Sequence, residues 1–276
     1  MALTVCARNG PTVHGKAIWG SRAAKRGTLY MGTASVLAII AGSCAGALVS
    51  GISGFAFGLM ALCIWAWVLP PSFLAPMVVA GSIVTQLSAL AVARHRVEWS
   101  RVMPFLTGGI LGVPLGVLLL GVMNIRLFKG VVGVLLVAYS SYFLLAAPKR
   151  AVCAGGRPAD GLAGFIGGFM GGLAGLNGPA PVLWCAVRGW SKDVQRGVLQ
   201  TFLLTTHCIT FVCYAATGKL TTPVLGALAW MLPAVLISAL AGAKVSERIS
   251  ERSFKHLVLM LLFLSGVALL VGVFLA

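Results

Sequence analysis

Two glycine-rich stretches decide how this chain folds: GISGFAFG at residues 51–58 and GLNGPAP at residues 175–181. At a shift of 124 residues, the glycines at the first and fourth positions of the two stretches coincide. Each stretch interrupts an apolar run, and a break at membrane depth is costly because lipid offers no hydrogen-bond partners to the freed backbone groups. Matched breaks, one in each half, are typical of membrane transporters that bind substrate where two repeats meet.

The composition indicates a membrane protein. Hydrophobic residues make up 59% of the 276 residues and charged residues only 9%, and the mean hydropathy is +1.00. So little charge in a chain of this length indicates a polytopic integral membrane protein. All five carboxylates are expected in short hydrophilic stretches between apolar runs, which argues against acid–base catalysis and buried acidic proton relays: Glu98, Asp160, Asp193, Glu247 and Glu251.

No catalytic constellation, metal site or cofactor site is expected. The seven cysteines show no CxxC spacing, and most of them lie inside apolar segments, where a thiol behaves as a small hydrophobe. The sequence also has no phosphate-binding loop of the Gly-x4-Gly-Lys-Ser/Thr type, so an ion gradient or a further partner would supply the energy for transport. We therefore expect a protein that is not an enzyme.

Ten apolar runs follow one another along the chain. Runs of about 20 residues can span the bilayer, whereas runs of 11–17 residues are half-length or re-entrant pieces. We predict an all-α polytopic membrane protein of two homologous, inverted repeats with broken or half-length helices, in about eight transmembrane helices and up to ten crossings. The runs cover residues 32–50, 53–69, 73–93, 102–122, 127–146, 160–175, 178–188, 197–216, 223–244 and 254–275.

Four segments follow from this repeat: a basic N-terminal extension (1–31), a first transmembrane repeat (32–147), a connecting loop (148–159) and a second transmembrane repeat (160–276). The extension carries five basic residues and no acid, and Met31 is an alternative start of the protein.

The net charge of +16 follows membrane topology, because Lys and Arg gather at the ends of apolar runs. Nucleic-acid binding is excluded, since no soluble domain exists to carry it. If the halves are inverted, one side of the membrane holds thirteen basic residues and the other holds three, not counting the extension. The thirteen comprise three in each of the segments 94–101, 147–159 and 188–197 and four in 244–255. Eight spans without inversion would place seven basic residues on one side and nine on the other. The positive-inside rule, which expects a clear excess on one side, therefore favours inversion.

Glycines at every fourth position predict close helix packing. Gly108, Gly112 and Gly116 form one such row, and Gly164, Gly168 and Gly172 form another. Rows of small residues let helix backbones approach in lipid, where no hydrophobic force drives helices together. We interpret these rows as packing features rather than as parts of a binding site.

The breaks supply the first candidate binding residues. In the second break, Asn177 is expected to cap the following half-helix, and Pro179 falls in its first turn, where a missing N–H costs nothing. Two half-helix N-termini from inverted halves would converge near the bilayer centre and suit a small anion. The alternative is a pair of kinks tolerated for packing. The candidates are Ser53, Gly54, Phe55, Asn177, Gly178 and Pro179.

The helices that follow the half-helices supply further polar candidates. Gln86 in the first half and Thr206 and His207 in the second are best placed to face the cavity. His207 is either a proton carrier or a hydrogen-bond partner of a facing helix. Serine and threonine hydroxyls often bond to their own helix instead.

Residues at the helix ends have simpler interpretations. Arg101 lies with Glu98 and Trp99 in a basic segment that is either an anion-attracting vestibule or, as we favour, a set of interfacial anchors. Four tryptophans near the half-helix ends are interpreted as interfacial belt residues: Trp65, Trp67, Trp184 and Trp190.

These motifs resemble the sulfite exporter (TauE/SafE) family, from about residue 33 to the C-terminus. The resemblance rests on both Gly-x-x-Gly breaks, on RVEW at 96–99, on the row Gly108-x3-Gly112-x3-Gly116 and on GLNGP at 175–179. It implies a multi-pass permease of the bacterial plasma membrane, usually with about eight spans, for sulfite, sulfonates or related organosulfur anions. The chain departs from the family pattern where Phe-Ala-Phe replaces an expected glycine cluster in the first break.

The sequence therefore predicts a secondary transporter whose partners are a small anion and the lipid bilayer, with a homodimer left open. A passive anion channel and a metal-ion permease are the alternatives. A metal-ion permease would need His, Asp or Glu inside the membrane, and His207 is the single such residue that we expect inside a span, because the others are expected at the edges of apolar runs or in loops.

Overall fold

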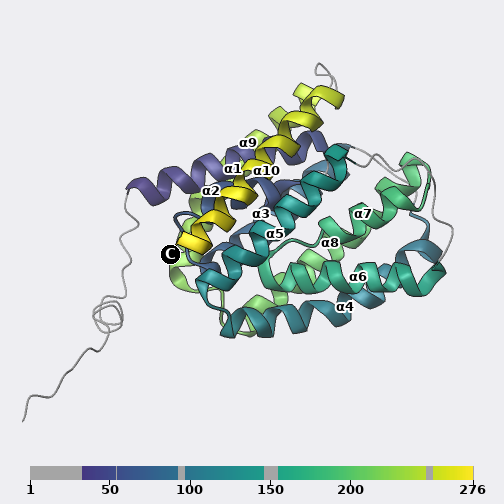
Figure 1. The fold of residues 1–276 in the computed structure, drawn as a ribbon, viewed down its shortest axis with the longest axis horizontal. Coiled ribbons are helices and arrows are strands. Elements are labelled where there is room, and N and C mark those ends of the chain that lie inside the picture. Colours follow the sequence, from purple (N-terminus) through teal and green to yellow (C-terminus); the bar gives the residue numbers. More distant parts are fainter. Residues whose placement is uncertain (1–32, 54, 93–96, 146–154, 247–250, 276) are drawn as a thin grey trace, which may run out of the picture. The chain divides into compact units, whose positions relative to one another are not determined.

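The computed structural model describes residues 33–53, 55–92, 97–145, 155–246 and 251–275. Within these ranges the chain forms ten α-helices and no strand (Figure 1). The predicted extension, and the connecting loop up to residue 154, lie outside the described residues. The helices are α1 (Thr33–Ser53), α2 (Phe57–Trp65), α3 (Pro71–Val92), α4 (Trp99–Val122), α5 (Ile125–Leu145), α6 (Gly156–Ala174), α7 (Pro179–Val187), α8 (Lys192–Ala216), α9 (Thr222–Ser246) and α10 (Glu251–Leu275).

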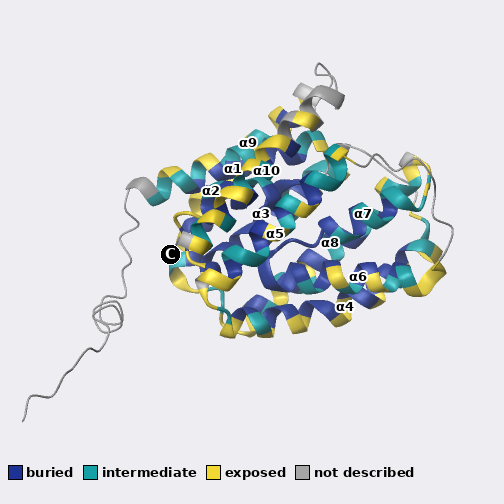
Figure 2. Cartoon of the chain, in the orientation of Figure 1, coloured by how far each residue is buried: buried dark blue, intermediate teal, exposed yellow. Residues whose placement is uncertain are grey.

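The expectation of an all-helical chain is confirmed for the described residues. Six helices are long and apolar enough to cross a membrane, namely α1, α3, α4, α5, α8 and α9. Their outward faces remain apolar: Leu111 and Leu118 of α4 are 68% and 67% exposed, and Ile237 of α9 is exposed as well. Figure 2 shows the buried residues on the faces where helices meet. An apolar outer surface of this kind fits contact with lipid.

The first half-helix, α2, runs back along α1 instead of continuing it. The Trp65 indole Nε1 at the end of α2 donates a hydrogen bond to the Ala38 carbonyl near the start of α1, at 3.0 Å. At the other end of α2, Phe57 packs against Gly46 of α1. α2 therefore lies antiparallel along the part of α1 between Ala38 and Gly46, and the break reverses the chain direction.

The second half-helix, α7, repeats this arrangement against α6. Asn177, before α7, packs on Gly171 near the end of α6, and Trp184, near the end of α7, hydrogen-bonds to Asp160 near the start of α6. Both short segments are therefore the returning arms of helical hairpins. Each of the two short runs is a half-length helix that folds back along the helix before it.

The glycine rows of α4 and α6 pack against each other, as predicted. A Cβ at Gly108 would overlap the backbone of Gly161, and Cβ atoms at Gly112 and Gly116 would overlap the backbone further along α6. In return, Gly164 and Gly168 of α6 face the backbone of α4. Residue numbers rise together along the contact, so α4 and α6 run parallel, side by side (Figure 1).

The remaining helix contacts form a regular pattern. α1 packs on α9, α5 on α10, α3 on both α8 and α9, and α4 on α8. Each helix of the first half has a counterpart five helices later, so that α1 corresponds to α6 and α5 corresponds to α10. Under this correspondence the contact α4–α6 becomes α9–α1, and the contact α3–α9 becomes α8–α4; both of these contacts are present. The contacts α3–α8 and α5–α10 each join a helix to its own counterpart. The largest contacts between the helices are therefore preserved when the halves are exchanged.

Contacts between connecting segments identify two ends of the bundle. At the end where α4 begins, Trp190, between α7 and α8, stacks with Phe105 and Arg101. Near the end of α4, Gly121 faces Lys219 of the α8–α9 connection. The α2–α3 connection is next to the start of α5, because Lys129 lies over the Trp67 ring.

Candidate functional site

The two breaks lie against each other in the interior of the bundle. A Cβ on Gly178, at the second break, would be 3.4 Å from Cδ2 of Phe55 at the first break. A Cβ on Gly58 would be 3.1 Å from Leu176 Cδ2 and 3.5 Å from the Gly175 carbonyl oxygen. The structure thus brings together two stretches that lie more than a hundred residues apart in the sequence.

Gly175 makes the reversal at the second break possible. It has φ +73°, in the left-handed region where a side chain would be strained, and it ends α6. Its N–H donates to the Gly171 carbonyl at 2.7 Å, and the next N–H, of Leu176, donates to the Met170 carbonyl at 3.3 Å. The Gly175–Gly171 bond is that of an αL helix end, which satisfies a carbonyl of the last turn and lets the chain leave in a new direction.

The expected N-cap at the second break is wrong by one residue. Gly178, and not Asn177, is the N-cap of α7, and no side chain caps this helix. Pro179 lies in the first turn, as expected. The Asn177 side chain cannot turn toward the α7 N-terminus because it packs on the bare Cα of Gly171.

The Asn177 side chain is the most unusual polar group at the breaks. It is 0% exposed, and within the described residues neither its Oδ1 nor its Nδ2 atom has a hydrogen-bond partner. Burying an unpaired amide costs about 1–3 kcal/mol. Such groups in folded proteins call for a functional explanation, and a ligand-binding role is one that fits this location.

The first break uses its polar residue differently. The Ser53 hydroxyl donates to the Val49 carbonyl at 2.8 Å and accepts the Ala56 N–H at 3.4 Å. Ser53 is exposed, and Gly54 lies outside the described residues. Ser53 therefore joins the end of α1 to the start of α2, while Phe55 is the residue of this break that reaches Gly178.

Of the candidates on the longer helices, His207 reaches a break. Its Nε2 lies 3.4 Å from the Gly175 carbonyl oxygen, and its Nδ1 lies 2.6 Å from the Leu203 carbonyl oxygen one turn earlier. Thr206 does not present its hydroxyl to the breaks, because Oγ1 donates to the Phe202 carbonyl at 2.7 Å. Gln86 is buried in α3.

Tyr214 is a contributor that the sequence analysis missed. It is fully buried in α8, and its hydroxyl donates to the Gly172 carbonyl at 2.6 Å. It follows His207 by seven residues, so both side chains lie on one face of α8 and hold the last turn of α6. This spacing is the signal in the sequence that could have identified it.

Comparison with known protein families agrees with this architecture. The family model described as Sulfite exporter TauE/SafE matches residues 38–269. The chain belongs to this family. Its members are transporters of sulfur-containing anions rather than enzymes, and the six apolar helices agree with a multi-pass membrane protein. No curated protein and no solved structure gives a significant match to the chain.

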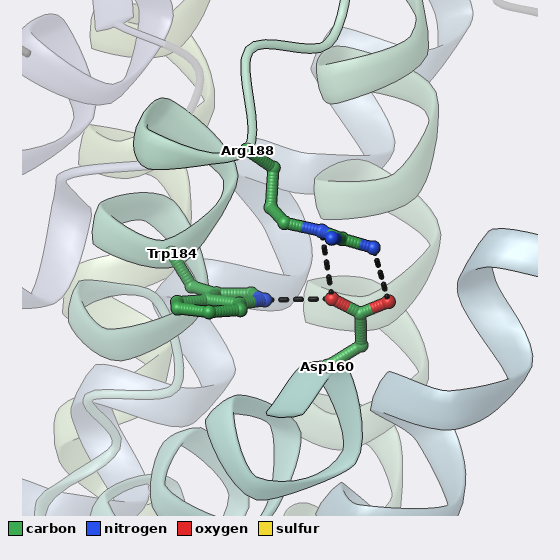
Figure 3. Close-up of polar contacts among 3 residues, drawn as sticks. All are labelled: Asp160, Trp184 and Arg188. Atoms are coloured by element: carbon green, nitrogen blue, oxygen red, sulfur yellow. Dashed lines mark hydrogen bonds and ion pairs between the residues drawn. The ribbon is translucent and has the colours of Figure 1, made fainter. Parts of the chain in front are cut away.

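The transporter also contains a buried ion pair that the sequence analysis did not anticipate (Figure 3). Asp160 was expected between apolar runs, but it lies inside α6 and is 3% exposed. Arg188, at the end of α7, places Nε 3.2 Å from Asp160 Oδ1 and Nη2 3.3 Å from Oδ2. Trp184 Nε1 donates to Oδ1 at 2.6 Å. Asp160 can be buried because these two residues supply a charge and a donor, and Trp184 is accordingly more than an interfacial belt residue.

An aromatic contact extends this cluster to α4. The Arg188 guanidinium lies 5.3 Å from the centre of the Trp190 ring, and Arg101 of α4 lies 5.2 Å from the same ring. Arg101 also pairs with Glu98 at 2.6 Å. The end of the α6–α7 hairpin is thereby connected to the start of α4.

Among the residues that the structure describes, no three His, Cys, Asp or Glu side chains gather closely enough to hold a metal ion. No observation therefore favours the metal-ion permease considered above.

Proposed function

We propose that this TauE/SafE protein is a secondary transporter that moves sulfite, sulfonates or related organosulfur anions, bound between its two glycine breaks. The observation that carries the proposal is the Asn177 amide, which is wholly buried and unpaired within the described residues beside the point where the breaks meet. An amide in this state is ready to bind a polar ligand.

The half-helix N-termini support an anionic ligand. α2 begins at Phe57 and α7 at Pro179, next to the contact between the breaks. The first N–H groups of a helix have no intrahelical acceptor and carry the positive end of its dipole. Ala180 offers such a donor in α7, whereas its two flanking prolines offer none. Sulfite or sulfonate oxygens could accept these bonds without a buried Lys or Arg.

Inverted repeats, residues 32–147 and 160–276, are part of the proposal. Three observations support them. The largest helix contacts are preserved when the halves are exchanged. The α1–α2 and α6–α7 hairpins each return toward the end of the bundle from which they started, so neither adds a crossing. Each half then has three crossings, and an odd number of crossings gives the second half the opposite orientation. With this orientation, the four segments that hold thirteen basic residues fall on the same side of the membrane, as the positive-inside rule expects.

In this mechanism, transport requires the breaks to separate. Phe55, Leu176 and Gly58 close the space between the half-helices in the present structure. Rocking one repeat against the other would admit the anion from one side and then from the other.

Counterflow in proteoliposomes tests the proposal. Vesicles loaded with unlabelled sulfite or sulfoacetate should accumulate the labelled anion, while sulfate and a carboxylate serve as comparisons. Counterflow that saturates and persists when an ionophore clamps the membrane potential supports a transporter, because a passive anion channel would accumulate the label only through that potential. We expect Asn177→Leu to lower the rate about tenfold, which corresponds to the loss of roughly one hydrogen bond to a charged group.

Asn124→Leu is the matched control. Asn124 precedes α5 far along the chain from either break, and its side chain already accepts the Leu127 N–H at 2.7 Å. Its removal should leave counterflow unchanged. Gly178→Leu, which would collide with Phe55, should abolish transport while membrane insertion continues. Wild-type rates for Asn177→Leu and Gly178→Leu would remove the breaks as the binding site.

A further inference from the structure

A groove opens on the outer surface between the first turns of α4 and α6. Its volume is about 540 Å³. It remains open because Gly161 has no side chain and because two compact prolines line it, just before the helix backbones meet at Gly108. The lining residues are Ser100, Met103, Pro104, Thr107, Arg157, Pro158 and Gly161.

One end of the groove is polar and positively charged. Arg157, in the first turn of α6, is exposed, and no carboxylate of the described residues pairs with it. The Ser100 side chain lies in the same part of the groove. Trp99, just before it, is 59% exposed, and exposed tryptophans of membrane proteins concentrate at the headgroup level. The charged end of the groove therefore lies where lipid headgroups lie.

The other end of the groove leads to an apolar strip. From Met103 and Thr107 the outer face of α4 continues through Leu111, Leu115 and Leu118, which are spaced by three or four residues and are all exposed. Residues at this spacing share one helix face. An acyl chain lying along this strip would cover apolar side chains next to the charged end.

We propose that this groove binds an anionic glycerophospholipid, with its phosphate at Arg157 and an acyl chain along α4. The charge supports an anionic lipid over a neutral one, because Arg157 lies at the end of the bundle that also holds the Arg101 and Arg188 segments. By the positive-inside rule this end faces the cytoplasm, and the cytoplasmic leaflet is the anionic one. The proposal depends on the membrane location and on the orientation proposed above, and not on the substrate site.

Binding of short-chain lipids to the purified full-length protein tests the proposal. Dioctanoyl phosphatidylglycerol and dioctanoyl phosphatidylcholine are titrated into the protein in neutral detergent, and bound lipid is counted by native mass spectrometry. We expect the wild type to prefer phosphatidylglycerol. Arg157→Gln should lower that preference about fivefold, the effect of one basic residue near an anionic lipid surface. Thr107→Trp, which fills the groove, should reduce binding of both lipids.

Arg126→Gln is the matched control for charge. Arg126 is also exposed in the first turn of a helix, but α5 begins at the opposite end of the bundle. Its loss should leave the lipid preference unchanged. Equal preference of the wild type for both lipids, or equal effects of Arg157→Gln and Arg126→Gln, would overturn the proposal. So would cross-linking that places a second copy of the chain over Thr107 in place of lipid.

Discussion

Replacing Asp160 by Asn removes one charge from a buried pair and leaves the shape of the side chain unchanged. Arg188 would then keep a guanidinium that is 15% exposed, facing an amide instead of a carboxylate. Breaking a buried ion pair costs about 3–5 kcal/mol. Two features lower this value: Arg188 retains some solvent contact, and the new amide oxygen can still accept the Trp184 N–H, which is worth about 1 kcal/mol. We therefore expect the unfolding free energy to fall by about 2–3 kcal/mol.

A double-mutant cycle separates the pair from its surroundings. The unfolding free energy of Asp160→Asn, Arg188→Gln and the double variant is measured in mixed micelles titrated with a denaturing detergent. If the two charges stabilise each other, the double variant should lose at least about 1 kcal/mol less than the sum of the single losses. Glu98→Gln is the control, because the Glu98–Arg101 side chains are 39–40% exposed and such pairs contribute about 0.2–1 kcal/mol.

Two results would refute this reasoning. Additive losses in the cycle would mean that the two charges do not interact. Equal losses for Asp160→Asn and Glu98→Gln would mean that burial gives the pair no special importance.

Two further predictions concern stability in the same assay. Gly112→Ala should destabilise the protein by about 1–3 kcal/mol, because the added methyl group overlaps the backbone of α6, whereas Gly130→Ala meets open space and should be neutral or stabilising by up to about 1 kcal/mol. Equal effects would show that the glycine row does not set the α4–α6 distance. Tyr214→Phe should cost about 1 kcal/mol through its bond to the Gly172 carbonyl. Tyr142→Phe, whose hydroxyl has no hydrogen bond within the described residues, should cost less, and the reverse order would contradict the role of Tyr214.

The sequence predicts the helices well because each is apolar and bounded by glycine, proline or charge, and most are long. The run expected at 102–122 corresponds to α4, Trp99–Val122, and the short run expected at 178–188 corresponds to α7, Pro179–Val187. The packing of the glycine rows was also predictable, since small residues at every fourth position have few other uses in lipid.

The chain reversal at the breaks was harder to predict. A glycine shows where a helix ends, but the direction taken next depends on a backbone angle, here φ +73° at Gly175, and on contacts with distant segments. The unpaired state of Asn177 has the same origin. Its side chain is trapped against Gly171, and the local pattern Asn-Gly-Pro predicts a cap instead.

The Asp160 cluster could not be predicted from local sequence. Asp160 lies 24 residues from Trp184 and 28 from Arg188. Only the hairpin brings these residues together, and a lone carboxylate near the start of an apolar run is usually exposed to water.

The contact between α4 and α6 has a consequence for the history of the protein. These helices belong to different halves, yet their backbones are so close that a Cβ on either glycine row would overlap the facing helix. Either half alone would leave its glycine row without the facing helix of the other half. If the halves are inverted as we propose, two separate copies of one half could have matched their rows only by inserting in opposite orientations, and fusion into one gene would have fixed both orientations.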